Sequence, residues 1–142
     1  MREFQIVDKN IETKLPVRGT KHSAGYDFFS TETVTIPPKG LVKINTNIRA
    51  VMNDDEYLSL HVRSSLGIKK NIMLANCTGI IDSDFALNPD NKICGALYNY
   101  GDTEVVIEKG DAFMQGIFTK YYTTDNDNVT TERVGGIGST GK

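Results

Sequence analysis

The chain has 142 residues, of which 39% are hydrophobic and 24% charged, and these proportions suit one globular domain with its own core. The formal net charge of −2 argues against a general nucleic-acid-binding protein, since such proteins usually carry a basic excess. No apolar run approaches the roughly 20 residues that cross a bilayer, and the first ten residues lack the apolar core of a signal peptide. We therefore expect a cytoplasmic protein with no membrane partner and no direct nucleic-acid binding.

Short strands of alternating polarity account for most of the chain. In the segment 41–51, apolar or small side chains alternate with polar ones, and the segment 57–63 repeats the pattern with Leu58, Leu60 and Val62 on one face. Similar runs occupy residues 3–8, 93–100, 104–108 and 114–121, with turns at 37–40, 99–102 and 109–111. The pattern predicts an all-β fold, an antiparallel jelly-roll-like barrel over residues 1–122.

Few other local signals interrupt the strands. The segment 64–71 predicts one short helical turn that begins at a serine cap. Cys77 and Cys94 stand 17 positions apart without the paired spacing of a zinc site, so we expect reduced thiols and no structural zinc. His22 and His61 are isolated, and each suits a surface or satisfied interior histidine better than a catalyst.

The last twenty residues, 123–142, form a polar stretch that predicts a flexible arm leaving the domain. Its end, GGIGSTGK at 135–142, matches most of a phosphate-binding P-loop, but such a loop opens a helix and is followed by a Ser or Thr. A P-loop is therefore disfavoured. A frayed end and an arm that wraps a phosphate both remain open.

Three polar clusters occupy points where strands give way to loops, which is where an all-β scaffold places function. The segment 61–67 ends a strand with Arg63 and continues with two serines, which suits phosphate oxygens as well as a plain helix cap. The segment 76–85 follows an apolar Ile80-Ile81 pair, expected to be buried, with two aspartates that could be turn formers or a base. The segment 24–30 places Asp27 among aromatic residues.

Five pieces of the chain, taken in order, resemble the five motifs of the trimeric dUTPase family. They are AGYDF at 24–28, RSSLG at 63–67, GIIDSDF at 79–85, GDAFMQ at 110–115 and RVGGIGSTG at 133–141. The resemblance implies hydrolysis of dUTP to dUMP and pyrophosphate. It also implies a jelly-roll homotrimer in which each active site draws on all three subunits, with the C-terminal arm exchanged between them.

The resemblance assigns a role to each matching residue. Asp82 corresponds to the aspartate that activates the attacking water, and Phe85 to the aromatic residue that packs under the deoxyribose. Asn76 and the backbone of Gly79, Ile80 and Ile81 correspond to the hairpin that reads uracil. The expected phosphate contacts are Arg63, Ser64, Ser65, Gln115, Arg133, Gly138, Ser139 and Thr140. Asp27 corresponds to the acid that holds Mg²⁺ through water, which makes Mg²⁺ the expected cofactor.

Three positions depart from the family pattern. Ile137 stands where the family usually has a phenylalanine that stacks over the uracil, and an aliphatic side chain covers a base without stacking. Ala112 replaces a common arginine, and the segment 86–94 is about four residues longer than the usual tight hairpin. We expect the longer segment to reshape the rim of the base pocket.

Alternative functions follow from the same fold. A dCTP deaminase would need a glutamate at the pyrimidine amino group, whereas the region around Asp82 offers aspartates. A protein-binding regulator of the phage dUTPase type would use the longer loop at 86–92 to hold a partner. A purely structural jelly roll has no use for Arg63, Asp82 and a glycine-rich arm together.

Overall fold

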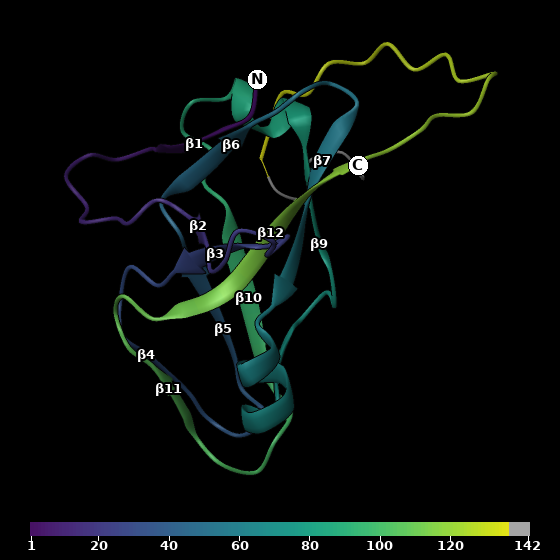
Figure 1. Ribbon diagram of the computed structural model, residues 1–142. Helices are drawn as coiled ribbons and strands as arrows, with labels where there is room; N and C mark the ends of the chain where they lie inside the picture. Colours follow the sequence, from purple (N-terminus) through teal and green to yellow (C-terminus); the bar gives the residue numbers. More distant parts are fainter. Residues whose placement is uncertain (137–142) are drawn as a thin grey trace.

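The computed structural model of the protein describes residues 1–136, and the elements of Figure 1 are almost all strands. Every strand pair is antiparallel, which confirms the predicted all-β antiparallel fold. Within residues 1–136 no helix is long and apolar enough to span a membrane. The elements are β1 (Glu3–Ile6), β2 (Val17–Arg18), β3 (Tyr26–Phe29), β4 (Val34–Ile36), β5 (Leu41–Asn45), β6 (Ile48–Val51), β7 (Glu56–Val62), η1 (Ser65–Lys69), β8 (Ile72–Leu74), β9 (Gly79–Asp82), η2 (Ser83–Leu87), β10 (Cys94–Asn99), β11 (Val105–Ile107) and β12 (Ala112–Lys120).

Two main sheets carry the residues of interest. The larger has the strand order β2-β3-β12-β7-β9 and the smaller the order β5-β10-β8, while β1 pairs with β6 and β4 with β11. In Figure 1 the long strand β12 crosses the middle of the molecule between β3 and β7. The hairpin of β8 and β9 joins the two main sheets, because β8 pairs with β10 and β9 with β7. This hairpin shapes the pocket described below.

The core forms from the inward faces of both sheets. Leu58 and Leu60 of β7 are buried as predicted, and they join Phe28 and Met114 from the neighbouring strands and Leu97 from the smaller sheet in one apolar cluster. Each such side chain contributes about 1.5–3 kcal/mol by leaving water. Burial of this size makes the sheets a rigid support for the loops that they carry.

The predicted strand 41–51 is two strands, because the chain bends at Asn47. This residue has a left-handed φ of 59°, a conformation that asparagine tolerates better than most residues. Its side-chain amide donates to the carbonyl oxygen of Asp8 at 2.9 Å and to Thr13 Oγ1 at 2.6 Å. The bend moves the chain from β5, which pairs with β10, to β6, which pairs with β1.

The helical turn after β7 is confirmed, but the serine cap is wrong. Ser64 makes no side-chain capping hydrogen bond to η1. Instead, the backbone N–H groups of Leu66 and Gly67 both donate to the carbonyl oxygen of Arg63, at 3.0 Å each. The turn is therefore closed by backbone groups, and the Ser64 hydroxyl is not needed as a cap.

The expected burial of the Ile80-Ile81 pair is half wrong. Ile81 is buried, but Ile80 is 63% exposed, because β9 is an edge strand whose side chains alternate between the core and the outer face. Asp82, two positions after Ile80, lies on the same outer face. The short helix η2 that follows, Ser83–Leu87, was not predicted.

The C-terminal arm leaves the body after β12. In Figure 1 this yellow-green to yellow segment makes a wide excursion and then returns. The side chains of residues 121–132 are exposed, and Arg133 is the next residue with substantial burial. A boundary between a domain at 1–122 and an arm at 123–142 stays a prediction.

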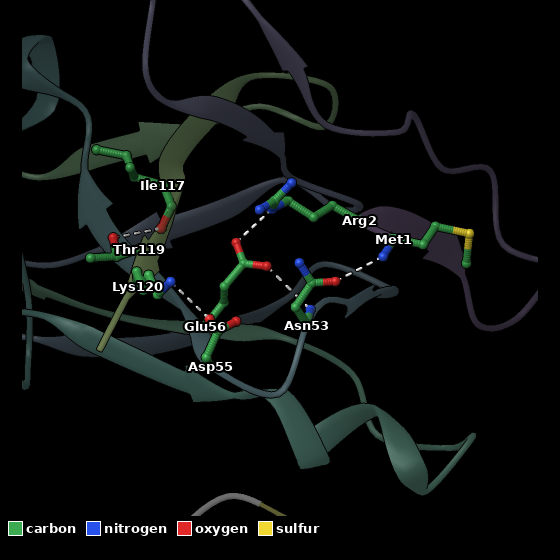
Figure 2. A network of polar contacts seen from close by, with 8 residues as sticks. All are labelled: Met1, Arg2, Asn53, Asp55, Glu56, Ile117, Thr119 and Lys120. Atoms are coloured by element: carbon green, nitrogen blue, oxygen red, sulfur yellow. Dashed lines mark hydrogen bonds and ion pairs between the residues drawn. The ribbon is translucent and has the colours of Figure 1, made fainter. Parts of the chain in front are cut away.

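The N-terminus is fixed to the turn before β7 by the polar network in Figure 2. Arg2 Nε donates to Glu56 Oε2 at 2.5 Å, and the terminal amino group of Met1 donates to Asn53 Oδ1 at 2.8 Å. The Glu56 side chain is only 7% exposed. Its hydrogen bond and charge raise the pKa of Arg2 above the ordinary value. The network joins β1 to the start of β7.

We expect Arg2→Ala to lower the thermal midpoint Tm by about 3 °C, because the nearly buried Glu56 carboxylate loses its cation. Lys120→Ala is the matched control, since its partner Asp55 lies 3.2 Å away and both side chains are more than half exposed. Its Tm should change by less than about 1 °C. Differential scanning calorimetry of both variants checks this, and equal shifts would contradict it.

Candidate functional site

A pocket of about 370 Å³ lies where the β8–β9 hairpin separates from β10. Its walls come from both main sheets, from η2 and from the returning arm. The predicted residues among its lining are Asn76, Gly79, Ile80, Ile81, Asp82, Phe85 and Arg133. The structure thus gathers one half of the predicted site residues around a single cavity.

The hairpin wall is formed largely by backbone. A Cβ atom at Gly79 would lie 2.8 Å from the Cβ of Leu60, so only glycine lets β9 approach β7 this closely. In the turn before β9, Cys77 has a left-handed φ of 65°, and the N–H of Thr78 donates to the carbonyl oxygen of Asn76 at 2.7 Å. An edge-strand backbone beside a pocket offers N–H and C=O groups at fixed positions, which suits recognition of the edge of a planar base.

Two carboxylates and one guanidinium meet at the pocket mouth. Arg133 Nη2 donates to Asp82 Oδ2 at 2.6 Å, and Arg133 Nε donates to Asp84 Oδ1 at 2.6 Å. The Arg133 side chain is only 8% exposed, whereas the Asp82 and Asp84 side chains are 53% and 40% exposed. Asp82 thus combines pocket access with the ability to accept a proton.

Phe85 closes the pocket from the core side. Its side chain is only 4% exposed and belongs to the core cluster, and the Arg133 guanidinium carbon lies 6.0 Å from its ring centre. Phe85 therefore both fills the core and lines the cavity. The ring is fixed by packing, so it can act as a rigid surface against a ligand.

The other predicted residues form a second cluster on the large sheet. Arg63 Nε lies 3.3 Å from Asp27 Oδ1, and Gln115 is the cross-strand partner of Asp27. Arg63 and Ser65 line a separate pocket of about 190 Å³ that shares no residue with the first. Ser64 is exposed beside them.

The two clusters are far apart within one chain. Asp27, Gln115 and His61 form one row across β3, β12 and β7, whereas Asp82 pairs with Tyr57 on β9 and β7. Three strand spacings of about 4.8 Å and four residues of about 3.3 Å separate Asp27 from Asp82, which places them roughly 20 Å apart. One nucleotide cannot place its reacting phosphate at both clusters of the same chain.

Four predicted residues, Ile137, Gly138, Ser139 and Thr140, lie outside the described residues. The longer segment 86–93 contributes no lining residue to the large pocket, since the lining passes from Phe85 to Cys94. The expectation that this segment forms the pocket rim is therefore wrong for the described chain. Asn91 instead ties the segment to η2 by donating to the carbonyl oxygen of Phe85 at 2.9 Å.

Sequence reasoning missed part of the lining. Lys43, Cys94 and Ala96 reach the pocket because Lys43 of β5 is paired with Ala96 of β10. Burial raises the pKa of the Cys94 thiol, against the opposing effect of Lys43 and Lys92. Both cysteines are free, as expected. The strand periodicity marked Lys43 only as an outward residue, and no local signal identifies its neighbour on another strand.

Within residues 1–136 no three His, Cys, Asp or Glu side chains form a group that could hold a metal ion by themselves. Asp27 is the acid assigned to Mg²⁺, and its side chain is 19% exposed beside Arg63. A single accessible carboxylate fits an ion that keeps most of its waters and is bound mainly by phosphate oxygens. The donor set is therefore compatible with Mg²⁺ delivered on a polyphosphate.

Comparison with known proteins gives a consistent family. The dUTPase family model matches residues 12–141. Deoxyuridine 5'-triphosphate nucleotidohydrolase of Lactococcus lactis is 42% identical over 147 aligned residues, which cover 99% of this chain and 98% of that protein. The crystal structure of dUTPase from Streptococcus mutans has a TM-score of 0.76 at 34% identity, covering 87% of this chain and 98% of that one. A dUTPase from phage phi11 of S. aureus, in which a structural Mg(II) ion is coordinated, has a TM-score of 0.76 at 19% identity over 94% of this chain and 99% of that one, which is a likeness of fold alone.

Proposed function

This chain belongs to the dUTPase family, and on that basis we propose that it hydrolyses dUTP to dUMP and pyrophosphate. The observation that carries the proposal is Asp82, which lines a pocket with a backbone hairpin on one side and a fixed aromatic ring on the other. This arrangement suits a pyrimidine nucleotide whose α-phosphate lies next to the Asp82 carboxylate.

Asp82 acts as the general base in this mechanism. A water molecule attacks the α-phosphorus, its oxygen forms the new P–O bond, and its proton passes to Asp82. The bond from the α-phosphorus to the bridging oxygen of the β-phosphate breaks, and pyrophosphate leaves with that electron pair. A carboxylate is a weak base, so positioning and charge stabilisation supply most of the acceleration.

Cations and neutral donors hold the phosphate chain. Arg63 offers a planar fork of donors to phosphate oxygens, while Ser64, Ser65 and Gln115 supply neutral donors. Asp27 contacts a water of bound Mg²⁺, and the chemistry that this ion supplies is neutralisation of charge that develops on the leaving pyrophosphate. Arg133 reaches the same phosphates from the arm, with Gly138, Ser139 and Thr140 beyond it and Ile137 covering the base.

The catalytic unit is a homotrimer with sites between subunits. Asp82 and Asp27 are roughly 20 Å apart in one chain, so the cluster of Arg63 and Asp27 must come from a neighbouring subunit to meet the Asp82 pocket. Threefold symmetry then completes three equivalent sites. The arm is exchanged between subunits, so that Arg133 reaches the pocket of a neighbour by the contacts it makes to Asp82 and Asp84 within one chain.

The rival functions have less support. No glutamate lines the large pocket, which leaves a dCTP deaminase without its acid-base group. The phage enzyme is similar at only 19% identity, and that level of likeness carries the fold but not a regulatory partner. The two free thiols suit a reducing compartment, and we place the enzyme in the cytoplasm.

Phe85→Leu should lower the dUTP over UTP selectivity in kcat/KM by about tenfold, because a smaller side chain leaves room for a 2′-hydroxyl. The ring is also part of the core, so Phe113→Leu is the matched control. Phe113 is fully buried in the same cluster but does not line the pocket. Both variants should lose similar stability, and only Phe85→Leu should lose selectivity. An unchanged ratio in Phe85→Leu would show that the sugar is recognised elsewhere.

Pyrophosphate release from the purified protein with Mg²⁺ tests the activity. The substrates are dUTP, dCTP, dTTP and UTP at equal concentration. Release from dUTP alone is expected. Release from dCTP at a similar rate, or from none of the four, would refute the proposal.

A further inference from the structure

We propose that Asp84 is a positioning residue that holds Arg133 at the pocket mouth, so that Arg133 can exchange Asp82 for a phosphate of the substrate without releasing the arm. The inference rests on the proposed function for its kinetic consequence. Its structural part stands on the contacts of Arg133 alone.

Arg133 is the point at which the returning arm is attached. Among residues 122–136, the hydrogen bonds and ion pairs that reach the body of the protein all come from the Arg133 side chain. The bonds at Asp127 and Val129 stay within the arm. Loss of an Arg133 contact therefore frees the described part of the arm rather than a single side chain.

The two carboxylates use different edges of the guanidinium. Asp84 accepts from Nε and Asp82 accepts from the terminal Nη2, each at 2.6 Å. Because the guanidinium is planar and its donors point in fixed directions, one contact can break while the other persists. The geometry permits a change of partner at Nη2 with Nε as the pivot.

The two carboxylates also differ in their access to the pocket. Asp82 lines the cavity and Asp84 does not. Asp84 lies in the short helix η2, which Asn91 ties to the following loop through the carbonyl oxygen of Phe85. Asp84 is therefore a fixed acceptor outside the space a nucleotide would occupy, and it does not compete for the reacting groups.

Burial explains why a second carboxylate is needed. The Arg133 side chain is 8% exposed, and a buried guanidinium without a partner is costly. If Asp82 were its only acceptor, Arg133 would either keep the base occupied or leave the pocket with the arm. Asp84 keeps the charge paired while Asp82 is released to accept a proton.

Asp84→Asn tests the inference, with Asp84→Glu as the conservative variant. Asp90→Asn is the matched control, because Asp90 is exposed in the same loop and makes no side-chain ion pair among the described residues. Limited trypsin digestion of the full-length protein, followed by mass spectrometry, measures cleavage after Arg133. We expect Asp84→Asn to be cleaved about tenfold faster than wild type, since cleavage follows the population of the open arm. Asp84→Glu and Asp90→Asn should resemble wild type.

The kinetic measurement separates positioning from chemistry. For Asp84→Asn we expect KM for dUTP to rise about tenfold while kcat falls less than threefold, since the base remains in place. A loss confined to kcat, or trypsin rates equal to wild type, would overturn the inference. The digestion needs no dUTP turnover, so an inactive wild-type protein would refute the proposed function and leave the arm contact to be judged on its own. The result does not depend on which subunit supplies the arm.

Discussion

Asp82→Asn is expected to lower kcat for dUTP by about 10²–10⁴-fold, because the asparagine amide cannot accept the proton of the attacking water. Binding of dUTP should be retained. The side chains have nearly the same shape, Arg133 keeps its contact with Asp84, and one negative charge near the triphosphate is removed. The variant thus separates chemistry from affinity.

Steady-state pyrophosphate release gives kcat, and isothermal titration with a non-hydrolysable dUTP analogue gives the affinity. Asp102→Asn is the control, because its side chain is 96% exposed and pairs only loosely with Lys39 at 3.6 Å. The control should behave as wild type. If Asp82→Asn kept a near-normal kcat, Asp82 would not be the base.

A chain that ends at Glu132 is expected to lose at least about 10²-fold in kcat/KM, because it lacks Arg133 and the glycine-rich end that supply phosphate donors. Its fold should survive. The last strand, β12, ends at Lys120, and the side chains of residues 121–132 are exposed, so the core does not depend on the arm.

Circular dichroism and size-exclusion chromatography with light scattering check the fold and the assembly of the truncated chain. We expect an unchanged β-sheet spectrum and a trimer. A monomeric product would show that the arm holds the subunits together. Nearly normal hydrolysis would show that Arg133 is dispensable.

Much of the fold could be predicted, since alternation is a local property. The inward positions Leu58 and Leu60 followed from period-two patterning alone. The break at Asn47 could not be predicted, because it depends on partners at Asp8 and Thr13, which lie far away in the sequence. The exposure of Ile80 depends on β9 being an edge strand, which is a property of the topology.

The site was predictable in its residue types but not in its arrangement. The motif residues around Asp82 and those around Arg63 are both present, yet the strand order places them at opposite ends of one sheet. Lys43 and Cys94 reach the pocket only through pairing between strands. The double role of Arg133 toward Asp82 and Asp84 depends on the path of the returning arm, which no local pattern encodes.

The most direct test of the central claim is a subunit-mixing experiment with two inactive variants, Asp82→Asn and Arg63→Ala. If each site takes Asp82 from one subunit and Arg63 from its neighbour, every trimer with both variants contains one intact site. Random assembly of equal amounts makes about three quarters of the trimers mixed, so dUTP hydrolysis should return to about one quarter of the wild-type rate after joint denaturation and refolding. No recovery, with mixed trimers verified by mass spectrometry, would contradict a site shared between subunits.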